Sequence, residues 1–102
     1  MSQYIIEYTC VRDWHTLSQT QDSHLLEAWF ESLPLVLHGN ASQTFLWFIV
    51  CRFDKILANR KLLPDTSHRW AYVDVALQLI SQRKDEITSK AHNLSTANAL
   101  CL

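Results

Sequence analysis

The stretch that most restricts the fold of this chain is TFLWFIVCRF, residues 44 to 53, its most apolar run. It is too short to cross a bilayer, and charged residues follow it at once. A strand this apolar would be buried on both faces, which requires helices on both sides of its sheet, and a short chain has few to supply. Placed on a helix over residues 42 to 61, the apolar side chains occupy a broad arc opposite a narrow polar stripe. The pattern therefore predicts a helix with Ser42 as its N-cap.

Few residues in this chain favour tight turns, since it contains 1 Gly and 2 Pro. Hairpins therefore lack their preferred turn residues, and helices are favoured. One further helix is predicted over residues 22 to 33, capped by Asp22 and ended or bent by Pro34. Another is predicted from Ser67 to Lys90. The three helices are expected to bury one common apolar stripe: Leu26, Trp29, Phe30, Ile49, Phe53, Leu77 and Ile80.

The N-terminal stretch YIIEYTCV, residues 4 to 11, is β-branched and aromatic, which predicts a strand. The expected fold is therefore mainly α, with a three-helix bundle-like core and an N-terminal extended segment. The alternative is an α+β fold whose small sheet pairs residues 4–11 with residues 35–38 or 44–52. The length of the chain predicts a single domain over residues 1–102.

The overall composition restricts the compartment and the partners. A net charge of -1 favours neither nucleic acid nor an anionic membrane as a partner. The three cysteines, Cys10, Cys51 and Cys101, are odd in number and match neither a disulfide framework nor a CxxC site. Cys51 lies in the apolar run, where a cysteine usually acts as a small hydrophobic residue. Since the N-terminus also lacks the pattern of a signal peptide, we expect a cytoplasmic protein.

No arrangement of reactive residues in the sequence predicts catalysis. None of the histidines belongs to an HExxH or CxxC-type metal motif, and a single glycine excludes phosphate-binding loops. Cys10 and His15 are near in sequence, but a nucleophile pair needs a geometry that spacing does not supply. Glu27 and Glu31 share a polar helix face and lack the apolar pocket that a general acid/base pair requires. We therefore expect no enzyme activity, no metal and no cofactor.

The apolar arcs of the helices at 42–61 and 67–90 are wider than the roughly 100° that a single core needs. Surplus apolar surface on so small a chain is typical of a contact with a partner. Some of these side chains lie beside the core stripe, and large aromatic residues are favoured at interfaces. The expected interface residues are Trp47, Tyr72, Val75 and Leu79.

A small basic region is the other candidate contact surface. It is formed by Arg52, Lys55, Arg60 and Lys61, which are candidates for contact with an anion or an acidic partner. The net charge of -1 instead favours a solvated stripe that complements the helix dipole.

Three functional hypotheses follow from these patterns. The principal one is a small non-enzymatic protein-interaction module, of the inhibitor, immunity, antitoxin or adaptor type, that acts through an apolar aromatic surface as a homodimer. The first alternative is a small-ligand-binding protein with an aromatic-lined apolar pocket. The second is a nucleic-acid-associated regulator that uses the basic helix at residues 52–61. The tail, residues 91–102, carries no pattern that favours one of the three.

Overall fold

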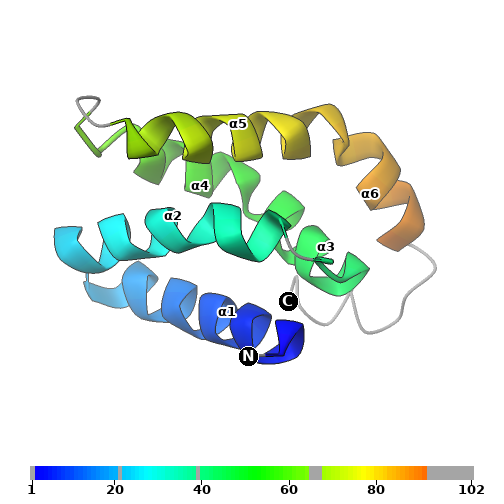
Figure 1. Ribbon diagram of the computed structural model, residues 1–102, viewed down its shortest axis with the longest axis horizontal. Helices are drawn as coiled ribbons and strands as arrows, with labels where there is room; N and C mark the ends of the chain where they lie inside the picture. The colour runs from blue at the N-terminus through cyan, green and yellow to red at the C-terminus, as the bar shows by residue number, and fades with distance from the viewer. Residues whose placement is uncertain (1, 21, 39, 65–67, 92–102) are drawn as a thin grey trace.

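The computed structural model describes residues 2–20, 22–38, 40–64 and 68–91, which form six helices and contain no strand (Figure 1). The helices are α1 (Gln3–Thr20), α2 (Ser23–His38), α3 (Gln43–Cys51), α4 (Phe53–Arg60), α5 (Arg69–Gln82) and α6 (Lys84–Ala91). In Figure 1, α1 and α2 lie side by side, α5 packs along the opposite side of α2, and α6 turns down beside α3. The expectation of a mainly α fold is confirmed, while the three-helix bundle is replaced by this six-helix arrangement.

The prediction of an extended segment at the N-terminus is wrong, because residues 4–11 lie within α1. Cys10, Trp14 and Leu17 recur at helical spacing and are buried on the side of α1 that faces the core. Burial of these side chains against α2 outweighs the local strand preference of the segment. The alternative prediction of a small sheet is also wrong, because the segments expected to pair with residues 4–11 belong to the helices α2 and α3.

Two of the predicted helices are interrupted. The helix expected over 42–61 breaks at Arg52, and the one expected from Ser67 breaks at Arg83. Residues 65–67 lie outside the described residues, so the predicted cap at Ser67 does too. At each break the backbone N–H bonds to the carbonyl three residues earlier, at 3.1 Å, which is the tighter turn common at helix ends. The turns redirect the chain so that α3 packs against α6.

The helix predicted to begin at Asp22 does not end at Pro34 but continues to His38. The proline ring removes the hydrogen bond to the Phe30 carbonyl, which ordinarily disfavours a proline inside a helix. Its neighbours Leu33 and Val36 are almost fully buried, and this burial keeps the chain helical beyond the proline.

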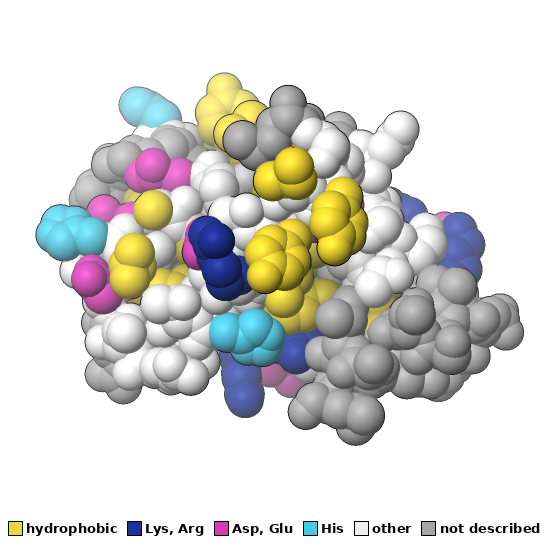
Figure 2. All heavy atoms as spheres, turned by 90° about the horizontal axis from the view of Figure 1, so that it is seen from below, with side chains coloured by type: hydrophobic (Ala, Val, Ile, Leu, Met, Phe, Trp, Pro, Cys, Tyr) yellow, Lys and Arg dark blue, Asp and Glu magenta, His cyan; other side chains and the backbone are white. Residues whose placement is uncertain are grey.

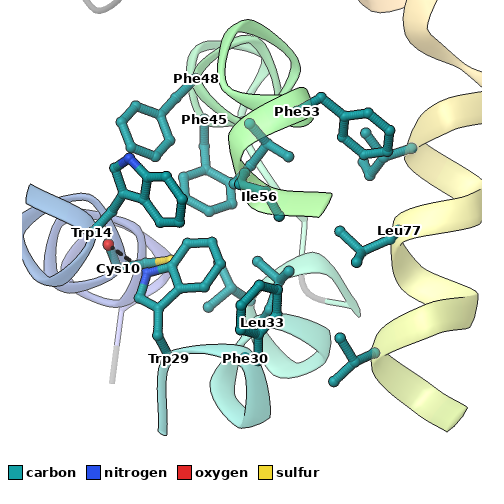
Figure 3. Packing of buried hydrophobic residues seen from close by; sticks show 14 of the residues in the cluster. Cys10, Trp14, Trp29, Phe30, Leu33, Phe45, Phe48, Phe53, Ile56 and Leu77 are labelled. Atoms are coloured by element: carbon teal, nitrogen blue, oxygen red, sulfur yellow. Dashed lines mark hydrogen bonds between the residues drawn. The ribbon is translucent and has the colours of Figure 1, made fainter. Parts of the chain in front are cut away.

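The hydrophobic core gathers side chains from all six helices, and Figure 3 shows part of it. The expected common stripe is confirmed: each of its residues is buried except Leu26, which is partly buried and packs against the others. Trp29 is its centre. The indole lies 4.9 Å from the Trp14 ring, measured between centroids, and its Nε1–H donates to the Cys10 carbonyl at 3.0 Å. That bond, dashed in Figure 3, joins α2 to α1.

Candidate functional site

Three large apolar side chains form an exposed line along α5, which we call the α5 stripe. Tyr72, Val75 and Leu79 are 70%, 59% and 50% exposed. They follow one another at three and four positions, the spacing that places side chains on one face of a helix. The opposite face of α5, with Trp70 and Leu77, is buried in the core. The helix therefore presents one apolar face to the interior and another to solvent.

Trp47, the fourth expected interface residue, lies on a different element. It belongs to α3, is half-buried and packs against the hydrophobic core. The structure therefore brings together three of the four residues and leaves the indole of Trp47 out of the α5 stripe.

The described surface around the α5 stripe is almost free of net charge. The exposed neighbours Ala71, Gln78 and Gln82 are neutral, and Arg83, four residues after Leu79, is paired with Glu86 at 3.7 Å. The one acidic neighbour, Asp74, receives two hydrogen bonds from the Arg60 guanidinium, at 2.8 and 3.0 Å. Its charge is therefore matched by a cation of the same chain.

The structure does not bring the four basic residues into one patch. Arg60 is buried, ties α4 to α5 through Asp74, and lies 5.5 Å from the centroid of the Trp70 ring. Arg52 is half-buried, with its guanidinium carbon 4.1 Å from the centroid of the Phe48 ring, and burial lowers its pKa from the usual value. The remaining pair, Lys55 and Lys61, is exposed. The contact of these residues with an anion or partner stays a prediction, and the hypothesis of a nucleic-acid regulator gains no support from their arrangement.

A second exposed apolar region lies on α1. It was not predicted, because residues 4–11 were expected to form a strand. Figure 2 shows the molecule from the α1 side, where hydrophobic side chains gather near the middle of the view. Tyr4, Ile5 and Tyr8 are 76%, 50% and 59% exposed. Between α1 and the start of α3 runs a groove of about 670 Å³, which we call the α1–α3 groove. It is lined by Gln3, Tyr4, Glu7, Tyr8, Val11, Asn40, Ser42, Thr44 and Phe45.

A polar cluster joins α1 to α3 in this groove. Ser42 is the N-cap of α3, as predicted, and its Oγ accepts a hydrogen bond from the Phe45 N–H at 3.1 Å. The Glu7 carboxylate accepts three bonds, from the Ser42 N–H at 2.9 Å, the Ser42 Oγ–H at 2.6 Å and the Gln3 Nε2–H at 3.1 Å. Glu7 and Ser42 lie 35 residues apart in the sequence, so spacing alone gave no signal of the contact between them.

An apolar hollow of about 350 Å³ lies between α1 and α2, and Cys10 and Trp29 are among its lining residues. Burial, followed by the nearby charge of Asp13, raises the pKa of Cys10 to about 12. The thiol is therefore protonated at neutral pH and is a poor nucleophile. His15 does not pair with it, since it is exposed and its ring contacts Phe48 at 6.3 Å between centroids.

Cys51 differs from its sequence-based expectation. It is exposed at the end of α3 and disulfide-bonded, where a small buried residue was predicted. Cys101 lies outside the described residues.

The described ranges contain neither a metal-binding cluster nor a membrane-spanning helix. No group of three or more His, Cys, Asp or Glu side chains is arranged to hold a metal ion there. In the same part of the chain, no helix has both the length and the apolar character needed to cross a membrane. The sequence matches no protein-family model, and neither a curated protein nor a solved structure is significantly similar to it.

Proposed function

We propose that this chain is a small non-enzymatic protein-interaction module that self-associates as a homodimer through the α5 stripe. The observation that carries the proposal is the exposed line of Tyr72, Val75 and Leu79, outside a core already filled by other side chains. Covering apolar surface gains about 25 cal/mol per Å² removed from water, so a partner that covers this line is favoured. Tyrosine is also among the residues enriched where interfaces are energetically strongest.

The spacing of the α5 stripe supports a second copy of the chain as the partner. Tyr72 lies three residues before Val75, and Leu79 lies four residues after it. If two α5 helices cross antiparallel about a two-fold axis near Val75, Tyr72 of each copy meets Leu79 of the other. The stripe is therefore complementary to itself.

The charge around the α5 stripe supports the same partner. In a two-fold contact, a residue near the axis faces its own copy, so an unmatched charge would repel itself. The charged neighbours of the stripe are matched within the chain, Asp74 by Arg60 and Arg83 by Glu86. An acidic or basic partner protein would therefore find little unmatched charge on this face to recognise.

The experiment is a charge exchange at the two outer positions of the stripe. Tyr72→Glu/Leu79→Glu and Tyr72→Lys/Leu79→Lys each place like charges opposite one another and should give monomers by light scattering, with helicity retained in circular dichroism. Mixed in equal amounts, the two variants should re-form a dimer, because each Glu then meets a Lys. Leu35→Glu, an exposed leucine on α2, is the matched control and should leave the dimer intact.

Two results would overturn the proposal. One is a wild-type protein that remains monomeric over the micromolar range. The other is a dimer whose mass is unchanged in both charged variants while the helicity is retained. Loss of helicity in these variants would instead mean that Tyr72 and Leu79 support the fold, which contradicts the interface assignment equally.

A second candidate function, small-ligand binding, is supported by the apolar hollow between α1 and α2. Its volume of about 350 Å³ lies within the range of ligand pockets, and its lining is mostly apolar. Indole, an apolar probe of suitable size, should raise the melting temperature of the wild type. Ala28→Phe, which fills the hollow from α2, should abolish that rise. No rise with the wild type would reject this candidate.

A further inference from the structure

We propose that the α1–α3 groove binds an organic cation, namely an ammonium or guanidinium group on an apolar stem, such as the side chain of lysine or arginine. This site is separate from the α5 stripe, so the proposal does not depend on self-association. It rests on the aromatic walls of the groove, on the charge of its carboxylate and on its size.

The walls of the groove carry two tyrosine rings on consecutive turns of α1. Tyr4 and Tyr8 are four residues apart, which makes them neighbours on one face of the helix. Both side chains are largely exposed, and both line the groove together with Phe45. The face of an aromatic ring is electronegative and attracts a cation within about 6 Å of its centroid.

The floor of the groove carries a carboxylate that no cation neutralises within the described residues. The three hydrogen bonds to Glu7 come from neutral groups of Gln3 and Ser42. Among the described residues that line the groove, Glu7 is the only charged one. The charge of its carboxylate therefore acts on whatever occupies the space beside it.

The N-terminus of α3 offsets only part of this charge. Ser42, which caps α3, bonds to Glu7, so the carboxylate also faces the positive end of the helix dipole. That end is equivalent to roughly +0.5 elementary charge, about half of the charge of a carboxylate. About half of the carboxylate charge thus remains, and it favours a cation in the groove over an anion or a neutral ligand.

The volume of the groove fits a cation that is attached to an apolar stem. At about 670 Å³ it falls within the range of roughly 300 to 1,000 Å³ for ligand sites. Val11 and Phe45 supply apolar contacts for a stem, while Tyr4, Tyr8 and Glu7 supply contacts for the charged group.

The test compares ligands of equal shape and different charge by nuclear magnetic resonance titration of the full chain. Tetramethylammonium and butylguanidinium should shift the amide signals of α1 and the start of α3. Choline should shift them too, whereas its uncharged isostere 3,3-dimethylbutan-1-ol should shift them much less at equal concentration. Acetyl-lysine amide and acetyl-arginine amide then report whether the cation is bound as part of a peptide. Binding of any of these cations supports the site, and the ratio between them identifies the source.

Two variants locate the binding energy. Glu7→Gln removes the charge but keeps an acceptor for Ser42, and should weaken tetramethylammonium about fivefold, the upper range for an exposed ion pair. Tyr8→Leu keeps apolar area but removes the ring, and should weaken it about threefold. Glu27→Gln on α2 is the matched control for the loss of a carboxylate and should leave affinity unchanged.

Equal binding of the neutral alcohol and the cations would overturn the proposal, since the groove would then be only an apolar surface. Full affinity in a folded Glu7→Gln variant would overturn it too. Should Glu7→Gln unfold, the comparison of ligands on the wild type and the effect of Tyr8→Leu still decide the question.

Discussion

The ion pair between Arg60 and Asp74 gives the sharpest prediction about stability. The Arg60 side chain is 11% exposed and the Asp74 side chain is 51% exposed, with Nε and Oδ1 2.8 Å apart. Breaking a buried pair costs about 3–5 kcal/mol, whereas an exposed pair contributes about 0–1 kcal/mol. Because only the arginine is buried, we expect an intermediate cost of about 2 kcal/mol for Asp74→Ala, which removes the Asp74 carboxylate from beside a buried guanidinium.

A double-mutant cycle separates this cost from the value of the pair. Arg60→Met keeps an apolar stem beside Trp70 and removes the buried charge, so we expect it to cost about 1 kcal/mol. The double variant Arg60→Met/Asp74→Ala should cost less than the sum of the two single variants by about 1 kcal/mol. Urea unfolding followed by circular dichroism measures all four proteins, and a constant slope with urea shows that only stability has changed. Additive costs, with a coupling below about 0.3 kcal/mol, would refute the reasoning.

The remaining predictions concern the contacts that α1 makes with α2, at Cys10, and with α3, at Ser42. Because burial raises the pKa of Cys10 to about 12 from the ordinary 9.0, the unfolded chain loses the thiol proton first, so stability should fall between those pH values. Cys10→Ser should remove this dependence, and a wild-type stability that is flat over the same range would contradict it. Ser42→Ala removes the N-cap of α3 and a hydrogen bond to Glu7, and should cost about 1–2 kcal/mol in thermal unfolding. A cost no larger than that of Ser81→Ala, at an exposed position in α5, would show that the cap does not stabilise α3.

The helices were predictable where one side of the pattern is clearly apolar. Residues 22–33 and most of 42–61 are helical as expected, because their apolar residues recur at three and four positions. The breaks at Arg52 and Arg83 were not predictable, since neither position carries a glycine or a proline. They arise where the chain turns to pack one helix on another, which depends on residues distant in sequence.

The candidate sites were predictable to different degrees. Tyr72, Val75 and Leu79 stand beside the core stripe of their helix in the sequence pattern, and the structure exposes them. Arg60 was interpreted as an exposed cation, because the sequence pattern does not indicate its ion pair with Asp74 on the next helix. The α1–α3 groove had no signal at all, since residues 4–11 were expected to be a strand and Ser42 is remote from them in sequence.

The amino-acid sequence by itself determined that the chain is mainly helical and which side chains of the later helices face the core. Both follow from periodicity, which is a local property of the backbone. The tertiary structure decided that α1 is a helix, that Arg60 forms an ion pair with Asp74 and that Glu7 accepts a hydrogen bond from Ser42. The physical reason is that each of these depends on burial or hydrogen bonding between segments distant in the chain, which outweighs local preference and leaves no mark on spacing.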